Sequence, residues 1–148
     1  MQSAQTPRYK LPLLAIGQAQ KELFHNEALV LLDFLIRPIV LAQHADPSSL
    51  DPADGEAWLV DQNTSGEWAS RQDQIAIWTA GGWRFIEPVA HSELFVVSVN
   101  ETAVFRDGNW VFGGSVFSPV GGSTIDVEAR QAIESILAAL RIKGVIEN

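Results

Sequence analysis

The chain has 148 residues, of which 47% are apolar and 19% are charged, so it is long and apolar enough to fold around one real core. Its formal net charge of −8 argues against a nucleic-acid partner, which would need clustered lysine and arginine, and against binding to an anionic membrane surface. Cysteine is absent, which excludes disulfides and thiolate metal sites. No apolar run reaches the ~18 residues of a membrane span and no signal peptide is visible, so we expect no membrane insertion and synthesis in the cytoplasm.

Residues 1–16 are predicted to form an extended N-terminal arm, because Pro7 and Pro12 disfavour a regular helix. The arm carries apolar side chains that need a surface to pack on. It therefore either wraps its own domain or clasps a neighbouring subunit. In the second case the candidate interface residues of the arm are Leu11, Leu13, Leu14 and Ile16.

Residues 17–36 have the periodicity of an amphipathic helix, which Pro38 closes. One side of this helix is predicted to be apolar and buried, and the opposite side to face solvent. The predicted apolar side holds Phe24, Ala28, Leu31, Leu32 and Leu35. The predicted solvated side holds Glu22, Asn26, Asp33 and Arg37.

Two polar residues, His25 and Glu27, interrupt the flanks of the predicted apolar side. A polar group on an apolar face costs stability unless it is paired. We therefore expect His25 and Glu27 to belong to a buried polar network, each with its own partner within the chain or across a subunit contact. They lie about 200° apart around the helix, so they cannot act on one substrate as an acid–base pair.

Residues 39–42 are predicted as a strand and residues 45–55 as a polar loop. From residue 56 onward, short runs rich in Val, Ile, Phe and Trp alternate with turn residues, which predicts a series of strands. The connections are too short for parallel crossovers, so we expect an antiparallel meander. The predicted strands are 56–61, 74–79, 82–87, 93–99, 102–106 and 109–113.

A last helix is predicted over residues 125–142, with Ser123, Thr124 or Asp126 as its N-cap and Gly144 just past its end. Its narrow apolar seam, spaced alternately by four and three residues, is typical of a coiled coil of about two heptads. Isoleucine at neighbouring seam positions favours a trimer, and a pentamer is the alternative. The candidate interface residues are Ala129, Ile133, Ile136 and Leu140, with Leu137 beside them.

The predicted fold class is α+β, with an N-terminal helix packed on a small antiparallel β-meander and a C-terminal helix that oligomerises. The expected organisation is an arm over residues 1–16, a helix-plus-sheet domain over residues 17–118 and a coiled-coil-like helix over residues 119–148.

Three tryptophans, Trp68, Trp83 and Trp110, follow turns in the predicted sheet. Exposed tryptophans beside turns could form a platform on which sugars stack, which makes these three candidate glycan contacts. The alternative, which we favour, is that each tryptophan opens a hairpin strand and fills the core of the sheet.

Motifs for a catalytic nucleophile, a phosphate loop or a dinucleotide are absent, and His25, His44 and His91 lack metal-site spacing. We therefore expect no enzymatic activity, no catalytic residue, no metal and no cofactor. The acidic residues Asp51, Asp54 and Glu56 could attract Ca²⁺, but they lack EF-hand spacing and are interpreted as a solvated loop.

The sequence also resembles a family of domains of unknown function found in tail, fibre and spike genes of alphaproteobacterial prophages and gene transfer agents. The resemblance covers nearly the whole chain, and its most specific blocks are Gly17–Lys21 and His25–Ala28 taken together. Further matching segments are Thr6–Arg8, Leu32–Asp33, Gly55–Val60, Thr64–Ala69, Gly82–Pro88 and the closing helix from Ile125 to Ile142.

This resemblance implies a non-enzymatic structural virion protein, in a tail fibre, head spike or spike base, that contributes to host attachment. The implied partners are further copies of the chain, other virion structural proteins and host-surface polysaccharide. A second hypothesis is a glycan-binding module that contacts capsule or lipopolysaccharide directly through exposed tryptophans. A depolymerising hydrolase is a weaker third hypothesis, because it would need a cleft with paired carboxylates.

Overall fold

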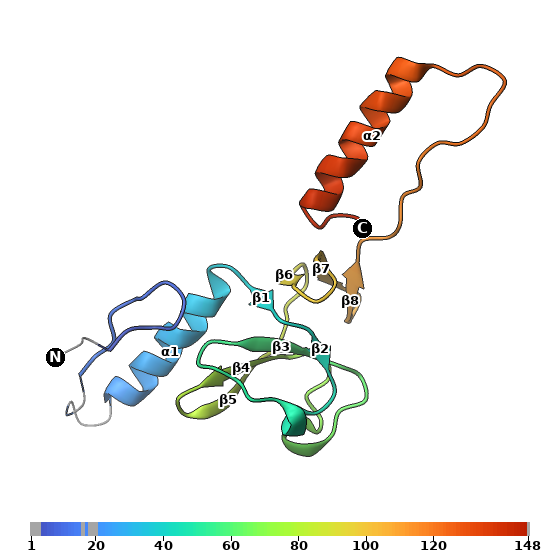
Figure 1. Ribbon diagram of the computed structural model, residues 1–148. Helices are drawn as coiled ribbons and strands as arrows, with labels where there is room; N and C mark the ends of the chain where they lie inside the picture. Colours follow the sequence, from blue (N-terminus) through green and yellow to red (C-terminus); the bar gives the residue numbers. More distant parts are fainter. Residues whose placement is uncertain (1–3, 16, 18–20, 148) are drawn as a thin grey trace. The chain divides into compact units, whose positions relative to one another are not determined.

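The computed structural model describes residues 4–15, 17 and 21–147 and divides the chain into two compact units, Met1–Pro88 and Val89–Asn148 (Figure 1). The break therefore differs from the predicted domain boundary at residue 118. It lies earlier because the residues that follow the last helix bind back to the second group of strands, for example through the bond from the Thr102 N–H to the Gly144 carbonyl at 2.7 Å. The second group of strands and the last helix thus form one unit.

The arm folds into a closed loop and is not extended as predicted. Gln5 and Pro12 form an antiparallel bridge, and the Thr6 N–H donates to the Leu11 carbonyl at 2.9 Å. Lys10 adopts a left-handed φ of 58°, which lets the chain reverse direction. The Thr6 hydroxyl accepts the Leu11 N–H at 2.9 Å, so the loop is closed by side-chain and backbone bonds together.

Helix α1 spans Lys21–Leu35 and ends shortly before Pro38, as the sequence predicts. Among the side chains of α1 that the structure describes, those of Asp33 and Phe34 are buried. Asp33 belongs to the side that was predicted to face solvent, so the assignment of the two sides was wrong.

The first unit holds one sheet with the strand order β2-β3-β4-β5. Strands β3, β4 and β5 pair antiparallel, as predicted, but β2 lies parallel to β3. The connection between β2 and β3 contains the short 3-10 helix η1 and is long enough for a parallel crossover, which the prediction overlooked. The bounds in this unit are β1 Ile39–Val40, β2 Gln43–His44, η1 Pro47–Ser49, β3 Ala57–Val60, η2 Gly66–Trp68, β4 Ile75–Thr79 and β5 Gly82–Ile86.

Two short 3-10 helices, η1 and η2, are joined by Asp46. The Asp46 carboxylate accepts the Ser48 N–H at 2.7 Å, which caps η1, and it also accepts the Ser65 hydroxyl at the start of η2. These hydrogen bonds favour the ionised form and lower the pKa of Asp46 to about 2. The loop that precedes β3 is therefore fastened to the loop that follows it.

The second unit begins with an antiparallel meander of β6 (Glu93–Val96), β7 (Glu101–Arg106) and β8 (Asn109–Phe112). Asp107 and Gly108 both have positive φ, at 51° and 79°, which suits the tight turn between β7 and β8 that the sequence predicts. An extended segment then leads to helix α2 (Val127–Ile142).

The predicted α+β class is confirmed, because an N-terminal helix, mainly antiparallel sheets and a C-terminal helix are all present. Within the described part of the chain, no helix combines the length and apolar character that crossing a membrane requires.

Candidate interaction surface

Helix α2 is defined by clear signals at both ends. The Asp126 carboxylate accepts the Ala129 N–H at 2.8 Å and caps the first turn. Gly144, with a φ of 65°, follows the last turn and donates its N–H to the Arg141 carbonyl at 2.9 Å. Both ends agree with the sequence-based prediction.

The predicted seam of α2 lies largely open. Ala129, Ile133 and Ile136 are exposed, with Ile136 at 58%, and Leu140 is half-buried. Leu137, beside the seam, is buried. The unit therefore covers the side of α2 that carries Leu137. The described residues of the unit leave the neighbouring seam largely uncovered.

The chain after α2 fixes the helix to the meander of its unit. Ile146 is buried, and an added Cβ on Gly144 would lie 3.0 Å from the Asn100 carbonyl oxygen and 3.0 Å from an edge atom of the Phe95 ring. Gly144 thus combines a left-handed backbone with a close approach to β7, and both features favour glycine. The C-terminal end of α2 is held in place.

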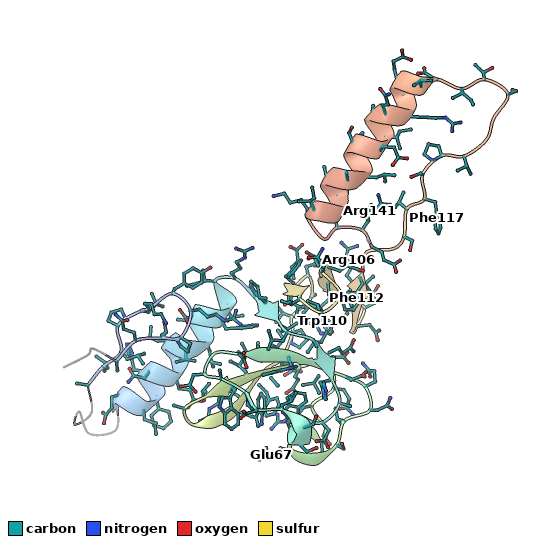
Figure 2. The ribbon with its side chains drawn as sticks, in the orientation of Figure 1. Glu67, Arg106, Trp110, Phe112, Phe117 and Arg141 are labelled. Atoms are coloured by element: carbon teal, nitrogen blue, oxygen red, sulfur yellow. The ribbon has the colours of Figure 1, made fainter. Side chains whose placement is uncertain are left out.

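The extended segment between β8 and α2 is held to the helix by two arginines. Arg130 donates to the carbonyls of Pro119, at 2.8 Å, and Gly121, while Arg141 donates to the Val116 carbonyl at 3.1 Å. Phe117, labelled with Arg141 in Figure 2, projects from this segment and is 86% exposed. The segment also exposes Val116, Val120 and Ile125, and further exposed apolar residues lie at the two ends of α2: Val127, Ile142 and Val145.

The N-terminal arm wraps its own unit in the described residues, which is one of the two predicted alternatives. Leu11, Leu13 and Leu14 are half-buried, and Ile16 lies outside the described residues. The arm is therefore a weaker candidate for a subunit interface than α2.

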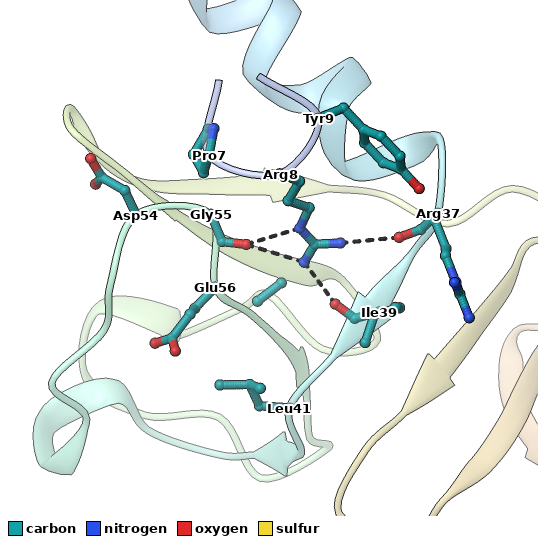
Figure 3. A pocket seen from close by; sticks show the side chains of 10 residues that line it. Pro7, Arg8, Tyr9, Arg37, Ile39, Leu41, Asp54, Gly55 and Glu56 are labelled. Carbon is teal, nitrogen blue, oxygen red and sulfur yellow. Dashed lines mark hydrogen bonds between the residues drawn. The ribbon is translucent and has the colours of Figure 1, made fainter. Parts of the chain in front are cut away.

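Arg8 anchors the arm through backbone carbonyls (Figure 3). Its guanidinium donates to Gly55 at 3.1 and 3.2 Å, to Arg37 at 3.0 Å and to Ile39 at 2.9 Å. It also lies 4.5 Å from the centre of the Phe34 ring. Burial lowers the pKa of Arg8, and the nearby charge of Asp33 partly opposes this effect.

A cavity of about 480 Å³ opens beside this anchor (Figure 3). Every nitrogen of the Arg8 guanidinium already donates to a carbonyl, so this cation is occupied by the fold and is not available to bind an anion. The other lining residues are Pro7, Tyr9, Arg37, Ile39, Leu41, Asp54, Gly55, Glu56 and Ala57. We therefore interpret this cavity as space beside the contact that anchors the arm, not as an anion-binding site.

Asp33 and Asn26 hold the arm from the side of α1. The buried Asp33 carboxylate accepts the N–H groups of Arg8 and Tyr9, each at 2.8 Å. The Asn26 side chain accepts the Leu14 N–H at 2.9 Å and donates to the Leu14 carbonyl at 3.0 Å. Sequence reasoning missed both roles, although Asp33 and Asn26 stand inside the matching blocks that carried the family resemblance.

The buried polar network predicted for His25 and Glu27 is found only in part, because Glu27 has a polar partner but is half-buried. Glu27 pairs with Arg84 of β5 through two bonds of 2.6 and 3.3 Å, and both side chains are half-buried. His25 is exposed, so the prediction that it is buried was wrong. The Glu27–Arg84 pair also lines a second cavity, of about 550 Å³, between α1 and the β4–β5 hairpin.

The candidate glycan contacts are not exposed platforms. Trp68 is 0% exposed, and Trp83 and Trp110 are half-buried. Trp83 makes edge-to-face contacts with Trp58, Trp68 and Trp78, at ring-centre distances of 5.6, 5.0 and 4.9 Å. The expectation that tryptophans fill the core of the sheet is confirmed for this cluster.

The acidic loop contains Asp51 and Asp54, which are exposed, and Glu56, whose carboxylate accepts the Ala53 N–H at 2.9 Å. Over residues 4–15, 17 and 21–147, no three histidine or carboxylate side chains are grouped so that they could hold a metal ion.

A family described as protein of unknown function (DUF2793) matches residues 25–111. Because the match covers more than half of the 148 residues, the chain belongs to this family. No curated protein matches the chain. The matched range contains most of α1 and ends within β8, so α2 lies outside it.

Proposed function

We propose that the chain is a non-enzymatic structural component of a phage or gene-transfer-agent particle. It would form part of a fibre, spike or spike base and contribute to attachment to the host surface. The blocks Gly17–Lys21 and His25–Ala28 support this proposal, because they resemble a family of domains encoded in the genes of such particles. The chain would be made in the bacterial cytoplasm and act in the assembled particle.

The observation that carries the proposal is the open apolar surface of the second unit. The seam of α2 and the segment that precedes it place apolar side chains in water, and α2 is fixed to its meander at the C-terminal end. An apolar surface of this kind is typical of a chain that assembles with others.

The assembly that this surface supports is a homo-oligomer built around α2. Ile133 and Ile136 occupy neighbouring seam positions, which favours three helices around one axis, and five is the alternative. About two heptads are too few to hold a coiled coil alone, so the extended segment with Phe117 would contribute to the same contact. Other virion structural proteins would bind the remaining surface.

Direct glycan binding through exposed tryptophans is the weaker alternative. The burial of Trp68 and the ring contacts of Trp83 leave these two side chains to the core, and Trp110 packs near Phe105 at a ring-centre distance of 5.3 Å. Contact with capsule or lipopolysaccharide would then involve other parts of the particle or of the chain.

Deleting the gene in the bacterium that encodes it and complementing it with variants tests this function. We expect particles without the chain to adsorb poorly to host cells, and the wild-type gene to restore adsorption. Ile136→Glu, which places a charge in the seam, should fail to restore adsorption. Gln131→Glu places a charge on α2 outside the seam and should restore it. Particles that adsorb normally without the chain would contradict the proposal.

A further inference from the structure

Helix α1, together with Ile36 just after its end, carries an apolar surface that its own unit does not cover. Phe24 is 75% exposed, Leu32 54% and Ile36 58%. Ala28 and Leu35 lie between them on the same side of the helix and are also exposed. We call these five residues, Phe24, Ala28, Leu32, Leu35 and Ile36, the α1 stripe.

The unit anchors α1 through its other side. Asp33 and Phe34 are buried, Asn26 binds Leu14 of the arm, and Glu27 pairs with Arg84. None of these contacts uses the α1 stripe. The sequence thus specifies an apolar face correctly, while the fold of the unit is built on the opposite face.

The size of the α1 stripe suits a contact between proteins. Its four large side chains expose roughly 400–500 Å² of apolar surface, which is in the range of the largest patch on a typical monomer. Two such stripes, facing one another, would remove on the order of 1,000 Å² from water, about what a specific interface needs.

The pattern of sizes along the α1 stripe favours a second copy of the same helix in the opposite direction. In an antiparallel pair centred between Ala28 and Leu32, each Ala28 faces a Leu32, and each Phe24 faces an Ile36. Ala28, the small residue of the α1 stripe, then faces the larger Leu32, which lets the two helices approach closely at the centre of the pair. A two-fold contact of this kind uses the same patch on both copies.

A membrane surface is a poorer occupant of the α1 stripe. Helices that lie on bilayers carry lysine and arginine on their polar side. Here the side opposite the α1 stripe carries Glu22, Glu27 and Asp33 as well as Arg37, so it is not cationic. The whole chain has a net charge of −8, which repels anionic lipid.

We propose that the α1 stripe is a second self-association surface, through which two copies pair helix α1 against helix α1 in antiparallel orientation. This contact involves no residue of α2. It would link the oligomers that α2 forms into pairs, and it would be made by copies of the chain whether or not they belong to a particle.

Sedimentation of full-length variants at micromolar concentration tests the contact. Leu32→Glu places a charge in the α1 stripe and should halve the assembled mass. Leu23→Glu is the matched control, because Leu23 is a leucine on the same helix at 62% exposure but lies outside the stripe. It should keep the wild-type mass.

The same measurement separates the two surfaces. Ile136→Glu should abolish the α2 oligomer and leave dimers, and the double variant with Leu32→Glu should be monomeric. Phe24→Gln provides a second, milder change in the α1 stripe, and circular dichroism verifies that each variant is folded. An unchanged mass for both folded stripe variants would overturn the α1 pairing, even if Ile136→Glu behaves as expected.

Cysteine cross-linking tests the orientation of the pair, because the chain contains no cysteine of its own. A mixture of the Ala28→Cys and Leu32→Cys chains should form a disulfide-linked dimer of the two, since these positions face one another in the antiparallel pair. Ala28→Cys alone should cross-link poorly. Efficient cross-linking of Ala28→Cys with itself, without the mixed dimer, would contradict the antiparallel arrangement.

Discussion

Replacing Asp33 with alanine should weaken the contact between the arm and α1. Asp33 is 1% exposed, and its two oxygens accept the N–H groups of Arg8 and Tyr9 at 2.8 Å each. A hydrogen bond to a charged group contributes about 1.5–3 kcal/mol, and the two donors would be left without this partner. We therefore expect Asp33→Ala to lower the free energy of unfolding of the first unit by about 3 kcal/mol.

Two further variants provide comparison values for this loss in the free energy of unfolding. Asp33→Asn keeps one acceptor oxygen but turns an amide donor toward the other N–H group, so it should cost an intermediate amount, about 1.5 kcal/mol. Asp51→Ala removes an exposed carboxylate and should stay within about 0.5 kcal/mol of the wild type.

Urea unfolding followed by tryptophan fluorescence measures these differences, because four of the five tryptophans lie in the first unit. Amide hydrogen exchange adds a local measurement, since the Arg8 and Tyr9 amides should exchange faster in Asp33→Ala. The reasoning is refuted if Asp33→Ala is as stable as Asp51→Ala and both amides keep their wild-type protection.

Three further changes test other parts of the fold. Asn26→Ala removes both hydrogen bonds to Leu14 and should lower the free energy of unfolding by about 1–3 kcal/mol in a denaturant melt. His25 is exposed, so His25→Ala should lower it by about 0.5 kcal/mol or less. Equal losses would show that the Asn26 bonds do not hold the arm. Trp83→Ala removes the ring that contacts three other tryptophans and should lower the free energy of unfolding by about 3–5 kcal/mol, measured by thermal melting. A folded variant with an unchanged melting temperature would contradict the role of Trp83 in the core. Gly144 has a φ of 65° and little room for a Cβ, so Gly144→Ala should destabilise the second unit by about 1–2 kcal/mol. Amide hydrogen exchange in β7 measures this loss. Unchanged protection of the β7 amides would show that the end of α2 is not anchored as described.

The sequence predicts most elements because their signals are local. The turn residues Asp107 and Gly108 mark a hairpin, and Asp126 and Gly144 mark the ends of α2. The predicted strands agree with the observed ones except at their ends and for the short β2. Such signals depend on the backbone preferences of a few neighbouring residues, so they need no knowledge of the tertiary structure.

The side of α1 that is buried was not predictable in the same way. Periodicity locates the apolar stripe with Phe24 and Leu32, and the usual inference is that the apolar side faces the core. The arm reverses this choice, because its backbone N–H groups at Arg8 and Tyr9 bind the carboxylate of Asp33 and its Leu14 backbone binds the amide of Asn26. These are pairings between residues far apart in sequence, which a hydropathy pattern does not encode.

The division into two units and the parallel pairing of β2 also depend on long-range contacts. Gln43 pairs with Leu59 across the connection that contains η1, and the Thr102 N–H binds the carbonyl of Gly144, which follows α2. Neither contact leaves a local mark in the sequence. The tryptophans are an intermediate case, since their size predicts burial but not which of them meet at Trp83.

Electron microscopy of purified particles that carry a gold label on this chain tests the structural role most directly. If the chain is a fibre, spike or spike-base component, label should appear at fixed attachment points on the particle, in numbers that repeat with three-fold or five-fold symmetry. Particles that carry no label, although the tagged chain is expressed and folded in the same cells, would contradict the structural role in the particle.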